Sequence, residues 1–490
     1  MTYKSKTRSR AGALLNASKE RGLSMAVEGY ARLPQSVAQK IARAQIRRGN
    51  RFQEGEEFLL HAIRVITDRW RSLHPTVRRR FVQNAFGYYL IHGPEKNRTA
   101  NALFDGEYPQ VMVVSPTMRC NLKCEGCYSF HYDRRDAIST ERLHLLLDEA
   151  KELGINFVVI SGGEPYLRKD LLELFETHAS MYFLTYTNGT IIADRGLAPT
   201  LAELGNVMPC ISVEGFKKET DARRGKGVFD KIVQAMHTMR ESGLIFGFSA
   251  TPMRHNNELL LTDEFVEFYK DLGCLVGWYF SYMPIGRSPS VELMPTPRQR
   301  LHRYRSIRAL RAKHNLILAD FWCDGMLTGG CLSGGRTFFH VNASGGVEPC
   351  VFNQFYVDSI LNKSLKECLT SAFMRDIRLS LNDVENPLRP CPVCDNPWLQ
   401  RRWVAEHGAK PAQMGGDDVL KGEVATFLDE YAVELKEIFD PVFEETRKGC
   451  PWPLHPERRP NPANLPPSRR PDGRPAPSAR PYHKPVVRER

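Results

Sequence analysis

Long apolar runs are missing from this chain of 490 residues. A helix that crosses a membrane needs about 20 consecutive apolar residues, and no run approaches that length, so we expect no membrane span. The basic N-terminus, residues 1–10, has no apolar segment behind it, which argues against a secretory signal. We therefore expect a cytoplasmic protein whose twelve cysteines are reduced thiols or metal ligands rather than disulfides.

Acidic residues are scarce at the two ends of the chain. Residues 1–51 contain twelve Lys or Arg against two acids, and residues 451–490 contain nine against three. Because the whole chain carries a net charge of +12, the body between these ends is net −4. Basic ends suit a polyanion, an acidic partner or a membrane surface, although solvated tails explain them as well. Twelve prolines and almost no apolar periodicity predict a disordered tail over 451–490.

The middle of the chain alternates between short apolar runs and amphipathic stretches. The apolar runs are the expected strands, and they cover 111–116, 155–160, 182–187, 207–213, 244–250 and 275–281. Amphipathic stretches between them place apolar residues at helical spacing, as at Leu143, Leu146, Leu147 and Ala150. Such alternation predicts an α/β fold with a parallel sheet, covering helices and right-handed crossovers.

Helical patterns flank this alternating region. Residues from about 26 to 92 have one, with Phe58, Leu59, Ala62 and Ile63 on a single stripe, and we expect a helical extension there. After residue 283 come a basic helix over 295–314, a cysteine-bearing region and an amphipathic helix within 403–448.

Three cysteines, Cys120, Cys124 and Cys127, follow the first expected strand within eight positions. The carboxyl end of a strand is where α/β barrels place their chemistry. Packing does not explain three cysteines among charged and polar neighbours, and a zinc site would need a fourth ligand, for which His131 is the near candidate. Four-iron clusters normally take four thiolates. Three clustered thiolates therefore favour a cluster with one iron left open.

A glycine-rich motif, Ser161-Gly162-Gly163-Glu164-Pro165, follows the second expected strand. Glycines let the backbone come close to a ligand, and Glu164 supplies a carboxylate at the strand's carboxyl end. A Gly-Gly pair alone would indicate only a turn.

Together, the Cys-x-x-x-Cys-x-x-Cys signature and the Gly-Gly-Glu motif one βα unit later resemble the radical S-adenosylmethionine (SAM) enzymes. The resemblance covers about residues 111–283 and extends more weakly to 398. It implies a partial (β/α)6 barrel of parallel strands, open on one side. It also implies that Cys120, Cys124 and Cys127 hold a [4Fe–4S] cluster whose open iron binds SAM.

The resemblance further implies which residues contact SAM. Glu164 would accept from the methionine ammonium, with the Gly162 and Gly163 backbone lining the pocket. The family usually has an aromatic residue where this chain has Gly126, so Tyr128 would take over part of the packing against adenine. Strand ends would supply further contacts to the ribose and the methionine carboxylate, the latter facing an arginine fork. These candidates are Asn188, Ser212, Glu214 and Arg224.

A second cysteine group comprises Cys331, Cys350, Cys391 and Cys394. It resembles the auxiliary-cluster extension of the same family, called SPASM, or its shorter twitch form, and four cysteines suffice for a second [4Fe–4S] cluster. Zinc is the alternative because Cys391-x-x-Cys394 is half a zinc ribbon, although the eighteen-residue gap after Cys331 fits a ribbon poorly. Cys323 or Cys368 is the alternative for one of these ligands.

The sequence therefore predicts five segments. They are a basic segment with a helical extension (1–105), the partial barrel (106–290), the auxiliary-cluster region (291–400), a C-terminal helix (401–450) and the tail (451–490).

By resemblance, the chain would cleave SAM reductively to a 5′-deoxyadenosyl radical, which abstracts hydrogen from a substrate C–H bond. An electron donor such as flavodoxin or ferredoxin is implied, and no catalytic acid or base can be named. The auxiliary region favours a peptide or protein substrate, because it often accompanies peptide maturation in this family. The same chemistry on a small molecule or RNA, and a non-catalytic iron–sulfur protein, are the alternatives. The acidic body and the lack of an RNA-binding module argue against nucleic acid.

Overall fold

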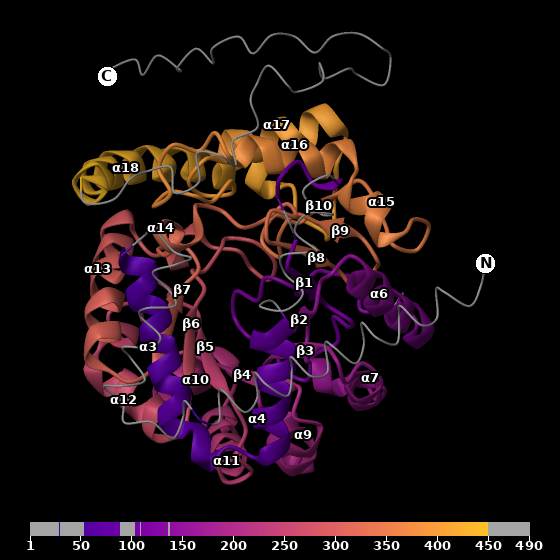
Figure 1. The fold of residues 1–490 in the computed structure, drawn as a ribbon. Coiled ribbons are helices and arrows are strands. Elements are labelled where there is room, and N and C mark those ends of the chain that lie inside the picture. The colour runs from indigo at the N-terminus through magenta and orange to yellow at the C-terminus, as the bar shows by residue number, and fades with distance from the viewer. Residues whose placement is uncertain (1–28, 30–52, 89–102, 108, 136–137, 449–490) are drawn as a thin grey trace.

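The computed structural model describes residue 29 and residues 53–88, 103–107, 109–135 and 138–448 (Figure 1). The predicted tail lies outside these residues, as do the parts of the predicted helical extension before residue 53 and after residue 88, apart from the single helical residue 29.

Seven parallel strands in chain order form the centre of the molecule (Figure 1). They are β1 (Val111–Val114), β2 (Phe157–Ile160), β3 (Tyr182–Thr187), β4 (Val207–Val213), β5 (Gly247–Ala250), β6 (Val276–Tyr279) and β7 (Ile317–Asp320). β8 (Phe338–Val341) pairs with β1 in parallel, and β9 (Val347–Glu348) pairs with β8 in antiparallel. The predicted α/β fold and partial barrel are confirmed, and β7 extends the six predicted strands to seven.

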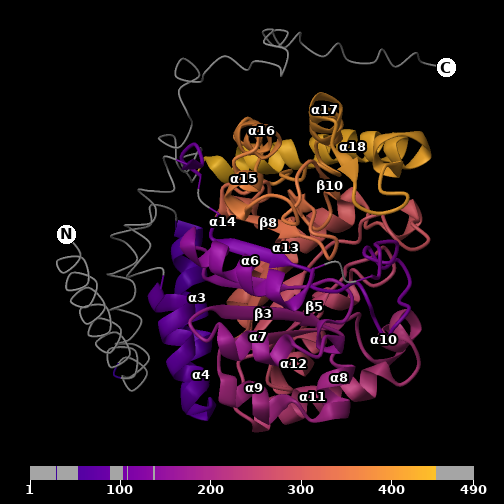
Figure 2. The same cartoon turned by 90° about the vertical axis from the view of Figure 1, so that its right-hand side faces the viewer.

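Helices cover the outer face of the sheet (Figures 1 and 2). They are α6 (Thr140–Glu152), α7 (Leu171–Thr177), α8 (Thr190–Arg195), α9 (Ala198–Leu204), α10 (Lys217–Arg224), α11 (Val228–Glu241), α12 (Asp263–Asp271) and α13 (Pro297–Lys313). Local sequence sets their limits, as at α6, where the Ser139 hydroxyl accepts from the Arg142 N–H at 3.2 Å. Gly154, with φ at +86°, follows the end of that helix because such a backbone favours glycine.

The helical extension covers the free edge of the sheet. α3 (Gln53–Arg69) lies beside β7, and α4 (Pro75–Arg80) follows it (Figure 1). His61 Nε2 donates to the Leu316 carbonyl at 3.0 Å, and the Arg311 guanidinium lies 5.1 Å from the centre of the Phe58 ring. An uncovered edge strand would be open to pairing with another chain, so α3 protects β7.

The basic helix α13 is held by buried ion pairs. Arg300 Nη1 lies 2.5 Å from Asp395 Oδ1, and Arg303 Nε lies 2.6 Å from Asp320 Oδ2, with both arginines buried. These charges therefore join α13 to β7 and to the segment after Cys394, and they do not form a nucleic-acid surface.

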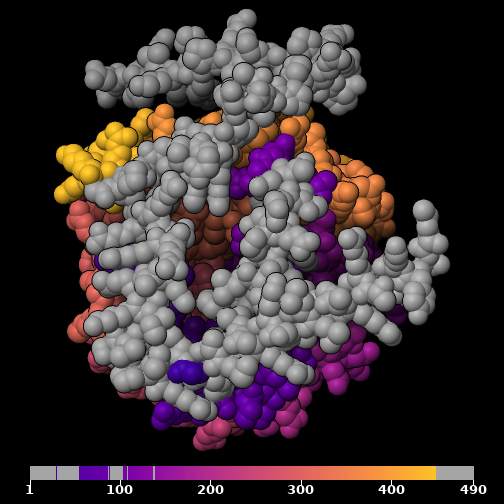
Figure 3. All heavy atoms as spheres, viewed as in Figure 1, coloured from indigo at the N-terminus to yellow at the C-terminus, as the bar shows by residue number. Residues whose placement is uncertain are grey.

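The C-terminal region lies over one end of the barrel (Figures 1 and 2). Its elements are α14 (Gly325–Thr328), α15 (Leu365–Leu369), α16 (Ala372–Leu381), α17 (Pro397–His407), α18 (Gly422–Arg447) and the pair β10 (Phe355–Tyr356) and β11 (Lys410–Pro411). On the right of the space-filling view, its atoms lie directly against those of the barrel (Figure 3). α18 is the predicted amphipathic helix, and it buries Tyr431, Leu435 and Phe439.

None of the helices in the part of the chain that the structure describes has the length and apolar character needed to cross a membrane.

Candidate functional site

A cavity of about 680 Å³ lies at the carboxyl ends of the strands, inside the barrel and beneath the C-terminal region. Both predicted cysteine groups reach it although they are about 200 positions apart in the chain. The cysteines that line it are Cys120, Cys124, Cys127, Cys331, Cys350 and Cys391. Cys394 lies behind this wall, where Trp322 Nε1 donates to its Sγ at 3.3 Å. Six of the seven predicted metal ligands thus face one space.

Burial and nearby charge determine the protonation state of the thiols in the first cysteine group. Burial raises the pKa of the Cys120 thiol to about 11 and also raises that of Cys124. The Arg224 and Arg223 guanidiniums oppose the rise in the Cys124 pKa, because positive charge favours the thiolate. Both arginines pair with Glu214 Oε1, at 2.5 and 2.6 Å. Metal binding needs the thiolate, so these arginines favour the form of Cys124 that can bind metal.

Hydrogen bonds from the C-terminal region hold the loop that follows Cys127. Gln413 Nε2 and Gln354 Nε2 donate to the Tyr128 carbonyl at 2.8 and 3.3 Å, and the His131 N–H donates to Gln413 Oε1 at 3.2 Å. The sequence analysis missed both glutamines, and nothing in their irregular segments marks them. The C-terminal region therefore positions the first cysteine group as well as carrying the second.

The two glycines of the second motif lie against the cysteine loop. The Gly163 N–H donates to the Thr117 carbonyl at 2.9 Å and the Glu164 N–H to the Arg119 carbonyl at 2.8 Å. A Cβ on Gly163 would lie 2.1 Å from the Arg119 oxygen, and one on Gly162 would lie 2.4 Å from the Thr117 oxygen. Glycine is therefore required at both positions for the two motifs to pack together.

The Glu164 side chain is fully buried and points toward β3 rather than into the cavity. Its oxygens accept from Thr187 Oγ1 at 2.8 Å, from the Asn188 N–H at 2.8 Å and from the Tyr166 N–H at 3.2 Å. Burial raises the pKa of this carboxyl to about 7, although the same hydrogen bonds oppose the rise.

The eight predicted SAM contacts fall into two sets. Glu164 and Glu214 lie behind the cavity wall, whereas six residues line the cavity. These six are Tyr128, Gly162, Gly163, Asn188, Ser212 and Arg224. Asn188 is held in place, since its Nδ2 donates to Asn121 Oδ1 at 2.8 Å and its Oδ1 accepts from the Thr190 N–H at 3.0 Å.

A buried polar network connects the two cysteine regions. His340 Nδ1 lies 2.6 Å from Glu348 Oε2, and His340 Nε2 lies 2.8 Å from Ser115 Oγ at the end of β1. The Tyr132 hydroxyl donates to Glu348 Oε1 at 2.9 Å, and Asn342 Nδ2 donates to the same oxygen at 2.5 Å. Glu348 precedes Cys350 by two positions and Tyr132 follows the first cysteines, so the network fixes one cysteine region against the other.

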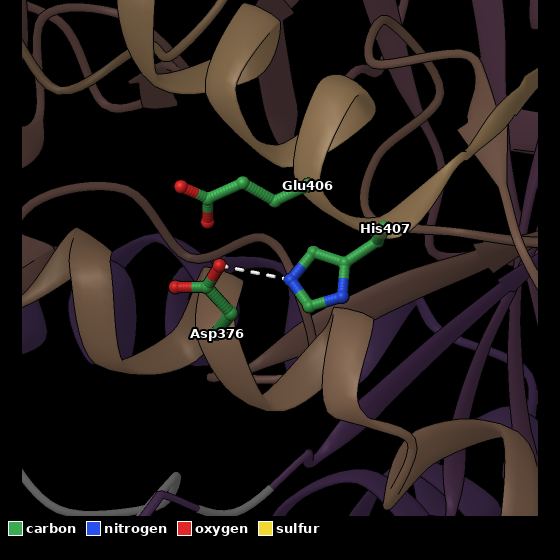
Figure 4. Close-up of side chains that lie close together, drawn as sticks. All are labelled: Asp376, Glu406 and His407. Atoms are coloured by element: carbon green, nitrogen blue, oxygen red, sulfur yellow. Dashed lines mark hydrogen bonds and ion pairs between the residues drawn. The ribbon is translucent and has the colours of Figure 1, made fainter. Parts of the chain in front are cut away.

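Another group of ligand-type side chains, Asp376, Glu406 and His407, lies outside the cavity (Figure 4). His407 Nε2 bonds Asp376 Oδ2 at 2.9 Å. The Arg402 guanidinium lies 3.0 Å from Asp376 Oδ1 and 3.9 Å from Glu406. Arg402 therefore already supplies the positive charge, and the group joins α16 to α17.

Comparisons with known proteins agree on one superfamily. Residues 114–272 match the Radical SAM superfamily. Mycofactocin maturase MftC of Mycolicibacterium smegmatis is 31% identical over 273 residues, which are 52% of this chain and 68% of MftC. AdoMet-dependent heme synthase of Methanosarcina barkeri is 26% identical over 317 residues, which are 59% of this chain and 88% of the synthase.

Two further matches cover different shares of the molecules. Fe-coproporphyrin III synthase of Methanosarcina barkeri is 36% identical over 174 residues, 34% of this chain, and the match spans only 43% of that protein. The solved structure of anSMEcpe with bound AdoMet and Kp18Cys peptide aligns with a TM-score of 0.50 and 16% identity. That alignment covers 70% of this chain and 99% of anSMEcpe, and it shows a shared fold.

Proposed function

This chain belongs to the radical SAM superfamily and is a radical SAM enzyme, and from that premise we propose that it modifies a peptide or protein at an unactivated C–H bond. The observation that carries the proposal is the single cavity that both cysteine groups and six SAM-contact candidates line. Cofactors and substrate would meet in that space.

The first cysteine group fits the [4Fe–4S] cluster that the family implies. Cys120, Cys124 and Cys127 face the cavity from one short loop, where burial raises the pKa of Cys120 and Cys124 and two arginines lie close by. When bound, the cluster and SAM supply the electron and the 5′-deoxyadenosyl radical that takes hydrogen from the substrate.

The chain's own residues would bind SAM and orient it. The backbone at Gly162 and Gly163 lines the cavity where no side chain fits, and Asn188 and Ser212 offer hydrogen bonds at the strand ends. Arg224, fixed by Glu214, is the candidate partner of the methionine carboxylate. We assign Glu164 to positioning Asn188 rather than to contact with the methionine ammonium, because its oxygens already accept three hydrogen bonds.

The second cysteine group would hold an auxiliary cluster of the SPASM type. Cys331, Cys350 and Cys391 line the cavity, and Cys394 is hydrogen-bonded to Cys391, which lowers the pKa of Cys391 despite its burial. Cys323 and Cys368 neither line the cavity nor are hydrogen-bonded to a cysteine that does, whereas Cys394 is bonded to the lining Cys391. We therefore retain Cys331, Cys350, Cys391 and Cys394 as the proposed ligands.

Metal analysis tests both assignments. Replacing Cys120, Cys124 and Cys127 together with Ala should remove about four irons per chain and leave an iron–sulfur absorption band from the auxiliary site. Cys368→Ala is the matched control and should keep all the iron. Unchanged iron in the triple variant would refute the first cluster, and zinc without iron at the second group would refute the auxiliary one.

The charged side chains that line the cavity indicate which class of substrate it can bind. The two heme-related synthases among the relatives raise the alternative of a tetrapyrrole, whose carboxylates would need unpaired cations. Of the described residues that line the cavity, none is a lysine. Arg223 and Arg224 share the one carboxylate of Glu214, and we assign the positive charge that this leaves over to the methionine carboxylate of SAM. The remaining lining arginine, Arg134, has an exposed side chain that lies over the Phe130 ring. The cavity therefore favours a peptide.

Cell-extract fractions test the peptide proposal. We expect a fraction that raises 5′-deoxyadenosine output from the reduced enzyme to lose that effect after protease digestion. Stimulation that survives the protease but disappears when small molecules are removed would refute it.

A further inference from the structure

Four inward-facing positions lie at one level of the barrel wall. Ser212 on β4 is the register partner of Ser249 on β5, Ser249 of Trp278 on β6, and Trp278 of Ala319 on β7. All four line the cavity. The sequence analysis singled out Ser212 for SAM and assigned no role to Trp278.

Trp278 carries a hydrogen-bond donor that the described part of the chain leaves without a partner. Its Nε1 atom is buried and makes no hydrogen bond there, whereas the two serine hydroxyls on the neighbouring strands lie 3.3 Å from each other. The indole stacks on the Phe280 ring, with centroids 6.1 Å apart and planes inclined by 17°. An unpaired buried N–H is costly, so we expect a molecule in the cavity to supply its acceptor.

The surroundings of Trp278 are aromatic and apolar. Phe280 contacts the rings of Tyr186 at 5.3 Å and Phe321 at 5.5 Å, and Phe321 contacts Phe338 at 5.5 Å. These rings all line the cavity. A side chain that enters the barrel would meet rings on several sides.

The carboxylates that line the cavity are already paired. Asp320 lies 2.6 Å from Arg303 Nε and accepts from the Trp322 N–H at 2.8 Å. Asp324 pairs with Arg311. A lysine side chain would find no free anion among these groups. A glutamate would find no lysine among the described lining residues, only the exposed Arg134 and the pair Arg223 and Arg224, whose charges go to Glu214 and, in the proposed function, to the methionine carboxylate. Burying a charge without a partner is strongly unfavourable.

We propose that the substrate presents an uncharged apolar or aromatic side chain to the barrel, and that Trp278 Nε1 donates a hydrogen bond to a neighbouring substrate oxygen, a carbonyl or a hydroxyl. This assignment rests on the proposed function. It names the class of peptide residue that the enzyme attacks and makes Trp278 a determinant of specificity.

The test measures hydrogen transfer from four probes to the cofactor. The probes are the N-acetyl amides of leucine, tyrosine, lysine and glutamate, each deuterated on the side chain and supplied to the reconstituted, reduced wild-type enzyme with SAM. Deuterium in 5′-deoxyadenosine should be at least about tenfold higher for leucine and tyrosine than for lysine and glutamate. Equal transfer, a preference for a charged probe, or transfer from none of the four would overturn the proposal.

Variants at Trp278 distinguish the contribution of its hydrogen bond from the contribution of the size of its ring. Trp278→Phe should raise KM for the neutral probes about tenfold with a smaller effect on kcat, because one hydrogen bond is lost and the ring is kept. Trp278→His restores a ring N–H and should recover part of the loss. Trp398→Phe on exposed α17 is the matched control and should change neither constant. An unchanged KM in Trp278→Phe, or a loss in kcat alone, would overturn the assignment.

A different experimental result would refute the proposed function itself. If the wild-type enzyme forms no 5′-deoxyadenosine from SAM and reductant, the radical chemistry is absent. If it forms 5′-deoxyadenosine but prefers a charged probe, only the substrate assignment is wrong.

Discussion

At the scale of single residues, the pKa of the buried Glu164 carboxyl shows how strongly the surroundings of a side chain act on it. Burial raises its pKa from 4.5 to about 7, against the hydrogen bonds from Asn188, Thr187 and Tyr166 that favour the charged form. Between these two pH values the folded chain binds more protons at this group than the unfolded chain does. Stability from this group is therefore fully present below pH 4.5 and is lost as the pH rises through 7.

Glu164→Gln should remove this pH dependence. We expect the free energy of unfolding of the wild-type protein, relative to the variant, to fall by about 2 kcal/mol between pH 5 and pH 8. The variant should be less stable at both pH values, because its amide NH₂ cannot accept a hydrogen bond, whereas both oxygens of Glu164 can accept one, in the acid at pH 5 and in the carboxylate at pH 8. Denaturant unfolding at the two pH values measures the change, with exposed Glu241→Gln as control. Parallel pH profiles for Glu164→Gln and the wild type would contradict the assignment.

At the scale of elements, the sequence predicted the first six strands of the sheet and missed those that follow, β7, β8 and β9. The predicted bounds of β3 and β4 agree with the structure, and the other four predicted strands are present but shorter. β7 has only four residues, of which the last, Asp320, is a buried carboxylate whose partner Arg303 lies on α13. A charge at a strand end resembles a loop in the sequence, because its partner becomes visible only in the fold.

The edge strand β7 also shows how the helical extension contributes to stability. α3 reaches the free edge of β7 through His61, whose Nε2 donates to the buried Leu316 and whose Nδ1 accepts from Arg64 at 2.8 Å. Burial lowers the pKa of His61, which keeps the ring neutral and able to make both bonds. The stability that this neutral ring contributes is lost as the pH falls below 6.5.

His61→Ala should lower the free energy of unfolding by about 1 kcal/mol at pH 8, because it leaves the Leu316 carbonyl without its partner. The difference in the free energy of unfolding between the variant and the wild type should shrink as the pH falls below 6.5, because keeping the buried wild-type ring neutral then costs free energy. Denaturant unfolding at pH 8 and pH 5.5 measures both effects. Exposed His237→Ala on α11 serves as control and should match the wild type. An equal loss at both pH values would contradict the neutral ring.

At the scale of the whole molecule, the two cysteine groups could be predicted from their spacing, but their meeting in one cavity could not. The contacts that join them come from residues without a motif, such as Gln354, Gln413 and Glu348. The direction of the Glu164 side chain was equally hidden, because the motif gives its position in the chain and not its hydrogen-bond partners. Short motifs therefore marked the chemistry, and long-range hydrogen bonds set its geometry.

The most direct measurement is the anaerobic formation of 5′-deoxyadenosine from SAM by the reconstituted protein with a strong reductant. We expect reductant-dependent product from the wild type, and none from the variant with Ala at Cys120, Cys124 and Cys127, although that variant stays folded and keeps its auxiliary iron. Product formation by the triple variant at the wild-type rate, or its absence from a wild-type protein with full iron content, would contradict the account.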